Sequence, residues 1–349
     1  MANKKKSMLR STLIVLCVVL GMIFTTLLAG TVYAEYLLGQ MHYVSNETPQ
    51  PSISIEDALA MQETDPTEVG STIQEQDPDD VDLGGKTNVI IGGKNSDLVN
   101  ILLIGADYQS GDIARSDTMI LCTFNKVKKT ITMTSFMRDM YVEIPKYGKS
   151  RLNVSYTWGG MQLLKETLEY NFGVQIDGMV EIDFTNFAKM IDMMGGVEIT
   201  LTSDQASFIN IKNGSSLKAG TTTLTGDEAL WYARYRGDAG RDFNRTSRQR
   251  ELLNLLLERY RNLKLTELIT WMDDLLPMVT TDMSKADVIG YAVSLFPMLS
   301  EAEFVSQRIP VEGEYYQARI NGMAVLVPDI PGNVDALVDT LSTDNGSVG

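Results

Sequence analysis

LVNILLIGADYQSGDIARSDTMILCTFNKVKKTITMTSF, residues 98–136, holds three runs of apolar and β-branched residues that are separated by short polar segments. Runs of this length, bounded by Gly, Asp, Asn and Ser, are typical of strands buried in a sheet. Farther along the chain, strand-like runs alternate with helix-like ones. This alternation predicts an α/β fold, an α-β-α sandwich around a mixed central sheet. We expect strands at 98–105, 118–124, 130–136, 141–144, 179–184 and 197–201, and helices at 161–170, 185–194, 227–234 and 246–262.

The composition removes most enzyme chemistries from consideration. The chain has 349 residues, 44% of them hydrophobic and 21% charged, which is enough for one large or two modest folded domains. It contains one histidine, His42, and two cysteines, Cys17 and Cys122. A Ser-His-Asp triad, a Cys-His pair or a zinc site with His or Cys ligands would need residues that this chain does not have in suitable places. Chemistry must therefore come from carboxylates, arginines, lysines, hydroxyls or a metal bound by oxygen.

Charge is unevenly distributed along the chain. The 30 Lys and Arg against 45 Asp and Glu give a formal net charge of −15, which argues against a general nucleic-acid-binding protein, because phosphate backbones attract positive surfaces. Residues 1–34 hold four basic and no acidic residues, whereas residues 35–84 hold twelve acidic and no basic ones. The boundary between these two segments coincides with the end of a long apolar run.

That apolar run covers residues 11–34, twenty-four positions without a charge. About 20 apolar residues suffice to cross the hydrocarbon layer of a membrane. Because basic residues precede the run and acidic ones follow it, the positive-inside rule predicts a cytoplasmic tail at 1–10, a transmembrane helix at 11–34 and an extracellular remainder. A cleaved signal peptide is the alternative, since the run ends in small residues, but its apolar core is usually only about 7–15 residues long. We therefore expect a single-pass protein of the cell membrane.

The part of the chain outside the membrane is predicted to have two sections. Residues 35–96 are acidic, with scattered prolines and one short helical candidate near 55–61, and are expected to form a flexible extracellular stalk. The folded domain is expected at 97–341, followed by a C-terminal tail at 342–349. Because only Cys122 lies in that domain, no disulfide is expected outside the cell and the fold depends on core burial alone.

Two aspartates flank the loop between the first two strands. Asp107 comes just after the apolar run that ends at Gly105, and Asp117 immediately precedes the next strand. Ligands of open α/β sheets bind beyond the carboxyl ends of strands, so these carboxylates could face one another there. Magnesium prefers one or two carboxylates with water and substrate phosphates, and needs neither His nor Cys. The alternative is turn chemistry, in which an Asp beside Gly or Thr caps the backbone of a turn.

Residues 229–250, ALWYARYRGDAGRDFNRTSRQR, concentrate arginine in an acidic protein and contain no lysine. Arginine binds phosphate oxygens with a bidentate guanidinium, and lysine does not replace it there. Arg245 and Arg248 fall at the start of the expected leucine-rich helix, where the helix dipole disfavours cations, so a bound anion would relieve the conflict. The alternatives are a solvated basic loop and, for Arg234 and Arg236, a favourable place near a helix C-terminus. The arginines of this segment are Arg234, Arg236, Arg241, Arg245, Arg248 and Arg250.

A charged pair, Arg138 and Asp139, follows the strand expected at 130–136. Its position at a strand end suits a site residue, and the alternative is an edge salt bridge without a function. Carboxylates for a metal together with converging arginines, all outside the membrane, point to phosphoryl transfer, in which positioning and charge neutralisation provide most of the catalysis.

Six stretches between Asn100 and Leu253 resemble the LytR-CpsA-Psr (LCP) family in their order and spacing. They read NILLIGAD, ARSDTMIL, TMTSFMRDMYVEIP, RLNVSYTWGG, LTGDEALWYARYR and DFNRTSRQRELL. The resemblance implies an enzyme that transfers an anionic glycopolymer, such as wall teichoic acid or capsule, from a polyprenyl-pyrophosphate carrier to peptidoglycan, with residues 97–341 as its catalytic domain. It also implies an apolar pocket for the lipid tail. The chain departs from the family pattern at Val154-Ser155, where His-Ala is frequent, and at Asn244, where glycine is frequent.

The resemblance also implies roles for individual residues. Mg²⁺ is the family's metal, and Asp107 and Asp117 match its metal-associated aspartates. We expect Arg138, Arg234 and Arg245 to neutralise the charge that develops during transfer, and Asp139, adjacent to Arg138, is the nearest candidate for proton handling. The positions that match pyrophosphate-binding and catalytic residues of the family are Arg115, Arg138, Arg234, Arg236, Arg245, Arg248 and Gln249.

Three other functions remain open from the sequence. An extracellular pyrophosphatase would act on the same lipid with water as the acceptor, and a non-catalytic binding module would hold the lipid without transferring anything. A transcription regulator is the third, but the predicted topology opposes it because the arginines would lie outside the cell.

Overall fold

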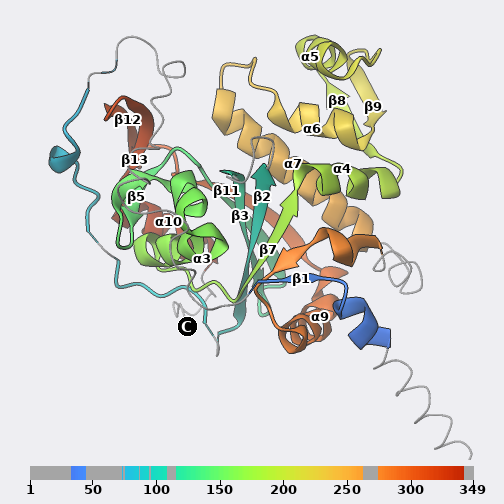
Figure 1. Ribbon diagram of the computed structural model, residues 1–349, viewed down its shortest axis with the longest axis horizontal. Coiled ribbons are helices and arrows are strands. Elements are labelled where there is room, and N and C mark those ends of the chain that lie inside the picture. The colour runs from blue at the N-terminus through green and yellow to red at the C-terminus, as the bar shows by residue number, and fades with distance from the viewer. Residues whose placement is uncertain are drawn as a thin grey trace, which may run out of the picture.

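A computed structural model describes residues 33–44, 73, 75–85, 87–93, 96–107, 115–261 and 274–341 (Figure 1). Its centre is a seven-stranded sheet in the order β1-β10-β7-β2-β3-β4-β11. β2 pairs antiparallel with β3 and parallel with β7, and β4 pairs parallel with β11, so the sheet is mixed. These strands are β1 (His42–Tyr43), β2 (Leu98–Asp107), β3 (Arg115–Asn125), β4 (Thr130–Phe136), β7 (Gly178–Asp183), β10 (Thr280–Thr281) and β11 (Glu303–Ile309).

Helices cover both faces of this sheet, as the alternation of side chains along β2 requires. Leu102 and Ile104 point into the core formed with α3 (Leu152–Phe172) and α10 (Ile330–Leu341). Val99 and Ile101 point to the opposite face, where they pack with α9 (Lys285–Leu299). Farther along the same face lie α4 (Phe184–Met193), α6 (Gly226–Arg234) and α7 (Arg241–Arg261) (Figure 1). The predicted α-β-α arrangement around a mixed sheet is therefore confirmed.

Short strand pairs extend the sandwich on either side. β8 (Val197–Leu201) and β9 (Gly220–Leu224) form one pair, and α5 (Ser203–Asn213) lies between them in the chain. Together with α4, α6 and α7 they enclose an apolar cluster separate from the main core. On the α3 side lie two further pairs: β5 (Tyr141–Ile144) with β6 (Gly148–Arg151), and β12 (Tyr315–Ile320) with β13 (Met323–Pro328).

Several elements differ from the sequence-based expectation. The run at 141–144 is a strand, but it belongs to a hairpin outside the central sheet. α3 begins nine residues before the expected 161, because a break at Gly159 and Gly160 separates its first turns from the rest. Gly160 has a φ of 62°, which a residue with a side chain rarely adopts. α7 begins at Arg241, before the expected 246, and α5 was not expected at all.

Part of the range predicted as a flexible stalk packs on the folded domain. Val81, Leu83 and Ile91 are buried in the core beside α3, and Ile91 forms a bridge with Val174. Residues 42–43 add strand β1 to the edge of the sheet. The predicted anchor at 11–34 lies outside the described residues except for its last two positions, and the tails at 1–10 and 342–349 lie wholly outside them. Among the helices that the structure describes, none is long and apolar enough to cross a membrane.

Candidate active site at the end of the central sheet

Asp117 owes its position to an irregularity in the β2–β3 pairing. Gly105 pairs with Thr118 and Ala106 with Ser116, so Asp117 is the extra residue of a β-bulge. In an unbroken strand Asp117 would share the face of Met119, which lies in the core beside α3. With the bulge, Asp117 instead lines a cavity on the opposite face together with Thr118. Bulges beside active sites commonly redirect a side chain in this way.

Asp117 is held ionised by arginine. Nη1 of Arg138 donates a hydrogen bond of 2.7 Å to Oδ1 of Asp117. Burial alone would raise the pKa of Asp117, but the nearby charges of Arg138 and Arg245 and the hydrogen bond outweigh it, so its pKa lies below the ordinary value. The ionised carboxylate can bind a cation, and it is a poor proton acceptor at neutral pH.

Arg138 connects two carboxylates. Besides Asp117, its Nε donates to Oδ2 of Asp139 at 3.3 Å, and Nη1 of Arg151 lies 3.8 Å from Oδ1 of Asp139. Burial opposes the charge on Arg138, but Asp139 and Asp117 outweigh it and raise its pKa. Arg138 thus stays charged in a nearly buried position, with 15% of its side chain exposed.

The other two predicted residues at this edge are placed by their backbones. Asp107 pairs with Arg115 in the β2–β3 register, at the strand ends next to the bulge. The structure therefore brings Asp107 and Asp117 to the same edge of the sheet. The side chains of Asp107 and Arg115 lie outside its described part.

A second group of charges reaches this point from α6 and α7. Nε of Arg245 lies 3.0 Å and Nε of Arg236 lies 3.4 Å from Oδ1 of Asp242, so one carboxylate forms ion pairs with two guanidinium groups. Arg245 is almost fully buried, and burial followed by the charge of Arg138 lowers its pKa. Asp242 and Asp117 therefore supply less negative charge than is needed to offset the burial of Arg245 and its neighbour Arg138. An anionic ligand would correct that deficit.

Arg248 has a different place from the one predicted for it. Its guanidinium donates to Oδ2 of Asp238 at 2.6 Å and to the backbone carbonyl of Tyr235. These contacts hold the loop between α6 and α7, and Arg248 is not among the residues that line the cavity. The predicted conflict with the helix dipole is smaller than expected, because α7 begins four residues before Arg245 and carries Asp242 in its first turn.

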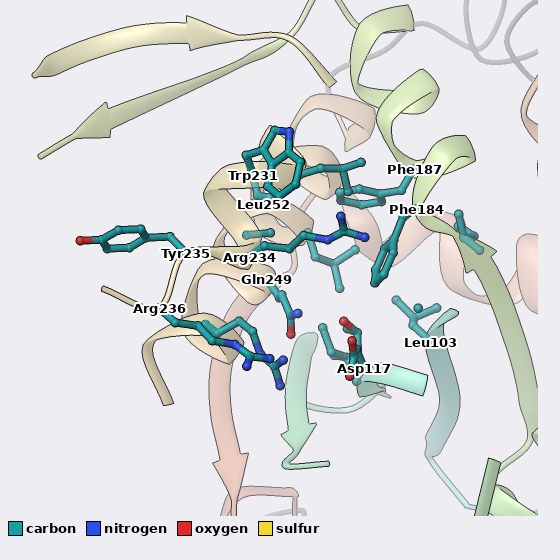
Figure 2. Close-up of a pocket in the computed structure, with 18 of the residues that line it drawn as sticks. Leu103, Asp117, Phe184, Phe187, Trp231, Arg234, Tyr235, Arg236, Gln249 and Leu252 are labelled. Atoms are coloured by element: carbon teal, nitrogen blue, oxygen red, sulfur yellow. The ribbon is translucent and has the colours of Figure 1, made fainter. Parts of the chain in front are cut away.

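The cavity that these charges border has a volume of about 600 Å³ and is mainly apolar (Figure 2). Side chains of β2, β3 and β7 form one wall, and those of α4, α5, α6 and α7 form the other. Figure 2 shows Arg234 and Arg236 extending from the α6–α7 side toward Phe184 and Asp117. The guanidinium of Arg234 lies 4.5 Å from the centre of the Phe184 ring. The polar part of the lining consists of Asp117, Thr118, Lys212, Arg234, Arg236, Arg245 and Gln249.

A smaller cavity of about 170 Å³ lies on the other side of the charges. Asp139, Arg151, Asp242, Phe243 and Gln317 are among its lining residues. The ion pairs connect the two cavities twice. Arg138 joins Asp117 to Asp139, and Asp242 joins the second cavity to Arg236 and Arg245. One charged layer therefore lies between an apolar cavity and a smaller cavity with a mixed polar and apolar lining.

The structure thus brings most of the predicted site together. Asp117, Arg138 and Asp139 are in direct contact, and Arg234, Arg236, Arg245 and Gln249 line the same cavity as Asp117. The sequence analysis missed Asp242 and Arg151, which complete the charged layer. Asp242 could have been found from its spacing, since it precedes Arg245 by three positions on a helix.

An apolar cavity that ends in arginines and an ionised carboxylate has the chemistry to accept an amphiphile with an anionic head group. The model of the LytR_cpsA_psr family matches residues 58–334, and the chain belongs to this family. The match begins within the range predicted as stalk, in agreement with the packing of residues 75–93 on the domain.

Relatives and solved structures agree with this membership. The chain is 33% identical over 256 residues to the regulatory protein MsrR of Staphylococcus aureus (72% of this chain, 76% of MsrR). It is 33% identical over 231 residues to the polyisoprenyl-teichoic acid–peptidoglycan teichoic acid transferase TagT of Bacillus subtilis (64% of this chain, 70% of TagT). The structure of TagT bound to LIIa-WTA matches with a TM-score of 0.60 and 28% identity, covering 75% of this chain and 99% of that one. TagT with bound octaprenyl pyrophosphate matches with a TM-score of 0.56 and 27% identity, covering 74% and 97%.

Proposed function

We propose that this protein is a phosphotransferase that attaches an anionic glycopolymer, of the teichoic acid or capsular type, from a polyprenyl-pyrophosphate carrier to peptidoglycan. The cavity carries the proposal: its apolar lining suits a polyprenyl tail, and its arginines suit the pyrophosphate at the end of that tail. Relatives named as teichoic acid transferases and a related structure with a bound polyprenyl pyrophosphate support it.

We further propose Mg²⁺ as the metal, held by Asp117 and Asp107. The donors fit a hard cation, because Asp117 is ionised and Asp107 reaches the same sheet edge. The hydrogen bond from Arg138 occupies Oδ1 of Asp117 and fixes the carboxylate. Bound there, Mg²⁺ would offset negative charge on the diphosphate oxygens.

The residues of the charged layer supply the remaining chemistry. Arg234, Arg236 and Arg245 bind and orient the diphosphate, and Arg138 stabilises the charge that develops on it. A peptidoglycan hydroxyl attacks the phosphorus that carries the glycopolymer, the bond from that phosphorus to the bridging oxygen breaks, and polyprenyl phosphate leaves with the electron pair. The hydroxyl proton passes to Asp139, which faces the second cavity.

The second cavity is the proposed entrance for the acceptor sugar. Carboxylates, Gln317 and the ring of Phe243 are the kinds of group that bind saccharides, and Nε of Arg151 is buried there without a hydrogen-bond partner in the described part of the chain. An acceptor hydroxyl placed there would lie against the charged layer, opposite the pyrophosphate.

Arg138→Ala tests the proposal. The full-length protein is incubated with lipid-linked polymer, with and without peptidoglycan, and released polyprenyl phosphate and the peptidoglycan mass are measured. A transferase releases polyprenyl phosphate and leaves a new phosphodiester on peptidoglycan. Release without that phosphodiester identifies a pyrophosphatase, and binding without release identifies a non-catalytic module. Loss of one well-placed arginine is expected to slow release by about 10²–10³-fold, and unchanged turnover removes Arg138 from the mechanism.

We also propose that the protein is a single-pass membrane protein with its catalytic domain outside the cell. The twenty-four uncharged positions at 11–34 and the charge difference across them support this topology. Protease digestion of intact cells is expected to remove the domain at 97–341. Protection of that domain would contradict the topology and favour an intracellular regulatory role.

A further inference from the structure

Exposed apolar side chains are concentrated in two segments of this protein that contact each other. In the described part of the chain, ten large apolar or aromatic side chains are exposed, and six of them belong to residues 33–44 or to α9. They are Tyr33, Tyr36, Tyr43, Val44, Ile289 and Val293. Concentrated exposure of this kind marks an interaction surface, whereas single exposed apolar residues are ordinary.

Helix α9 is apolar on both its faces. Leu295 and Met298 on the inner face are buried against β2 and β4, so the helix is already docked on the sheet. The outer face presents Ile289 and Val293, which are 42% and 71% exposed. The charged residues of α9 among its described side chains, Lys285 and Asp287, both lie in its first turn. A helix that is apolar all round is usually buried on all sides.

The chain immediately after the predicted membrane helix is fixed to α9. Nζ of Lys285, at the start of α9, forms an ion pair of 3.1 Å with Oε2 of Glu35. Glu35 is one residue beyond Ala34, the predicted end of the membrane helix. β1 then pairs with β10, four residues before α9 begins, and the Tyr43 hydroxyl donates to the Leu38 carbonyl. At 1.5 Å per residue, α9 is about 22 Å long, so its outer face lies within about that distance of the point where the chain would leave the membrane.

We propose that the outer face of α9, together with Tyr33 and Tyr36, rests on the outer surface of the membrane lipid. This proposal uses the predicted anchor and is independent of the transferase activity. Tyrosine is favoured at the boundary between lipid head groups and water, and an uncharged helical face can insert its apolar side chains just below that boundary. The contact would hold the domain in one orientation close to the membrane in which a polyprenyl carrier is embedded.

The test places a fluorescent probe on each of two exposed apolar positions. The full-length protein with Cys17→Ser is given either Val293→Cys on α9 or Ile211→Cys on α5, which is 81% exposed and serves as the matched control. Cys122 is buried, with a pKa raised to about 12 by its burial, and is left in place. Each protein is labelled with an environment-sensitive dye and reconstituted into phosphatidylcholine vesicles that contain nitroxide-labelled lipid.

We expect the probe at Val293 to shift its emission to shorter wavelength and to be quenched by the nitroxide lipid, and the probe at Ile211 to do neither. Adding Ile289→Glu is expected to abolish the quenching at Val293, with the same thermal unfolding temperature. Equal exposure of the two probes in vesicles overturns the proposal, and so does a full-length protein that fails to float with the vesicles. Release of polyprenyl phosphate, measured on the same samples, reports on the transferase proposal separately.

Discussion

Asp117 and Arg138 form the ion pair on which the charged layer depends, and Asp117 has a distinct signature in pH. Its pKa is lower in the folded protein than the ordinary value of 3.8. The ionised form of Asp117 therefore makes its full contribution to stability when the pH is above that ordinary value. The contribution is lost as the pH falls through the lower pKa of the folded protein. The stability of the native protein should accordingly fall on acidification partly through this residue.

Asp117→Asn tests this linkage. The difference in unfolding midpoint between the native protein and the variant, measured in urea, is expected to be largest near neutral pH and to shrink below about pH 4. The variant should also lose transfer activity by about 10²–10³-fold, because a charged ligand of the site is gone. A constant difference between the two proteins from neutral to acidic pH would contradict the assignment.

Arg248 should behave as a structural residue, in contrast to Arg138. Its guanidinium is bound within the loop that joins α6 to α7, so Arg248→Ala leaves Asp238 and the Tyr235 carbonyl without their partner. We expect a loss of about 1–3 kcal/mol in the free energy of unfolding, measured in urea. Arg138→Ala is the comparison: it also leaves two carboxylates without their partner and should lose stability, but in addition it should lose most of its turnover. If Arg248→Ala weakened substrate binding without changing stability, Arg248 would instead be a substrate-binding residue.

At the scale of the element, the bulge between β2 and β3 is what turns Asp117 toward the cavity. Gly105 lies opposite Thr118 beside the bulge, and a Cβ at Gly105 would come within 2.9 Å of the Thr118 Cβ. Gly105→Ala is therefore expected to push the strand ends apart and to lower turnover more than it lowers the melting temperature. Gly290→Ala on α9 is the control, because a Cβ there meets nothing within 4 Å, and it should leave turnover unchanged. Full activity of Gly105→Ala would show that the bulge tolerates displacement.

Which elements could be predicted follows from how each one is stabilised. The runs that became β2, β3 and β4 are buried, so hydrophobicity alone revealed them. α5 is polar and depends on a capping box between Thr202 and Gln205, which gives little periodic signal. The first turns of α3 were missed because Gly159 and Gly160 interrupt the helix, and their position depends on tertiary packing.

The candidate site divides in the same way. The concentration of arginine in an acidic chain showed the residues of the site before any geometry was known. Which of these arginines line the cavity depends on the carboxylate that each one contacts. Arg245 contacts Asp242 and lines the cavity, whereas Arg248 contacts Asp238 and holds a loop. The bulge at Asp117 and the bridging place of Asp242 arise from pairing between distant segments, which spacing along the chain does not reveal.

At the scale of the whole molecule, the apolar cavity lies between the sheet and a layer of helices, α4 to α7, that has an apolar cluster of its own. Leu253 and Leu257 of α7 pack directly on β3 and β4. Different side chains form the apolar part of the cavity wall and its charged end, so mutations should affect the two independently. Side chains far from the arginines should govern how much lipid tail is accepted, and the arginines should govern the head group.

Leu103→Trp tests that separation. Leu103 of β2 lines the wall of the cavity across from Arg234 and Arg236 (Figure 2), and the larger ring would occupy space that a long tail needs. We expect KM for a long polyprenyl carrier to rise by about tenfold, since a shortfall of roughly 1.4 kcal/mol in apolar contact corresponds to that factor. A carrier with a short prenyl chain should be used almost as well as by the native protein. Val127→Trp, at an exposed position between β3 and β4, controls for the added ring, and equal losses on both carriers would show that the tail does not occupy this cavity.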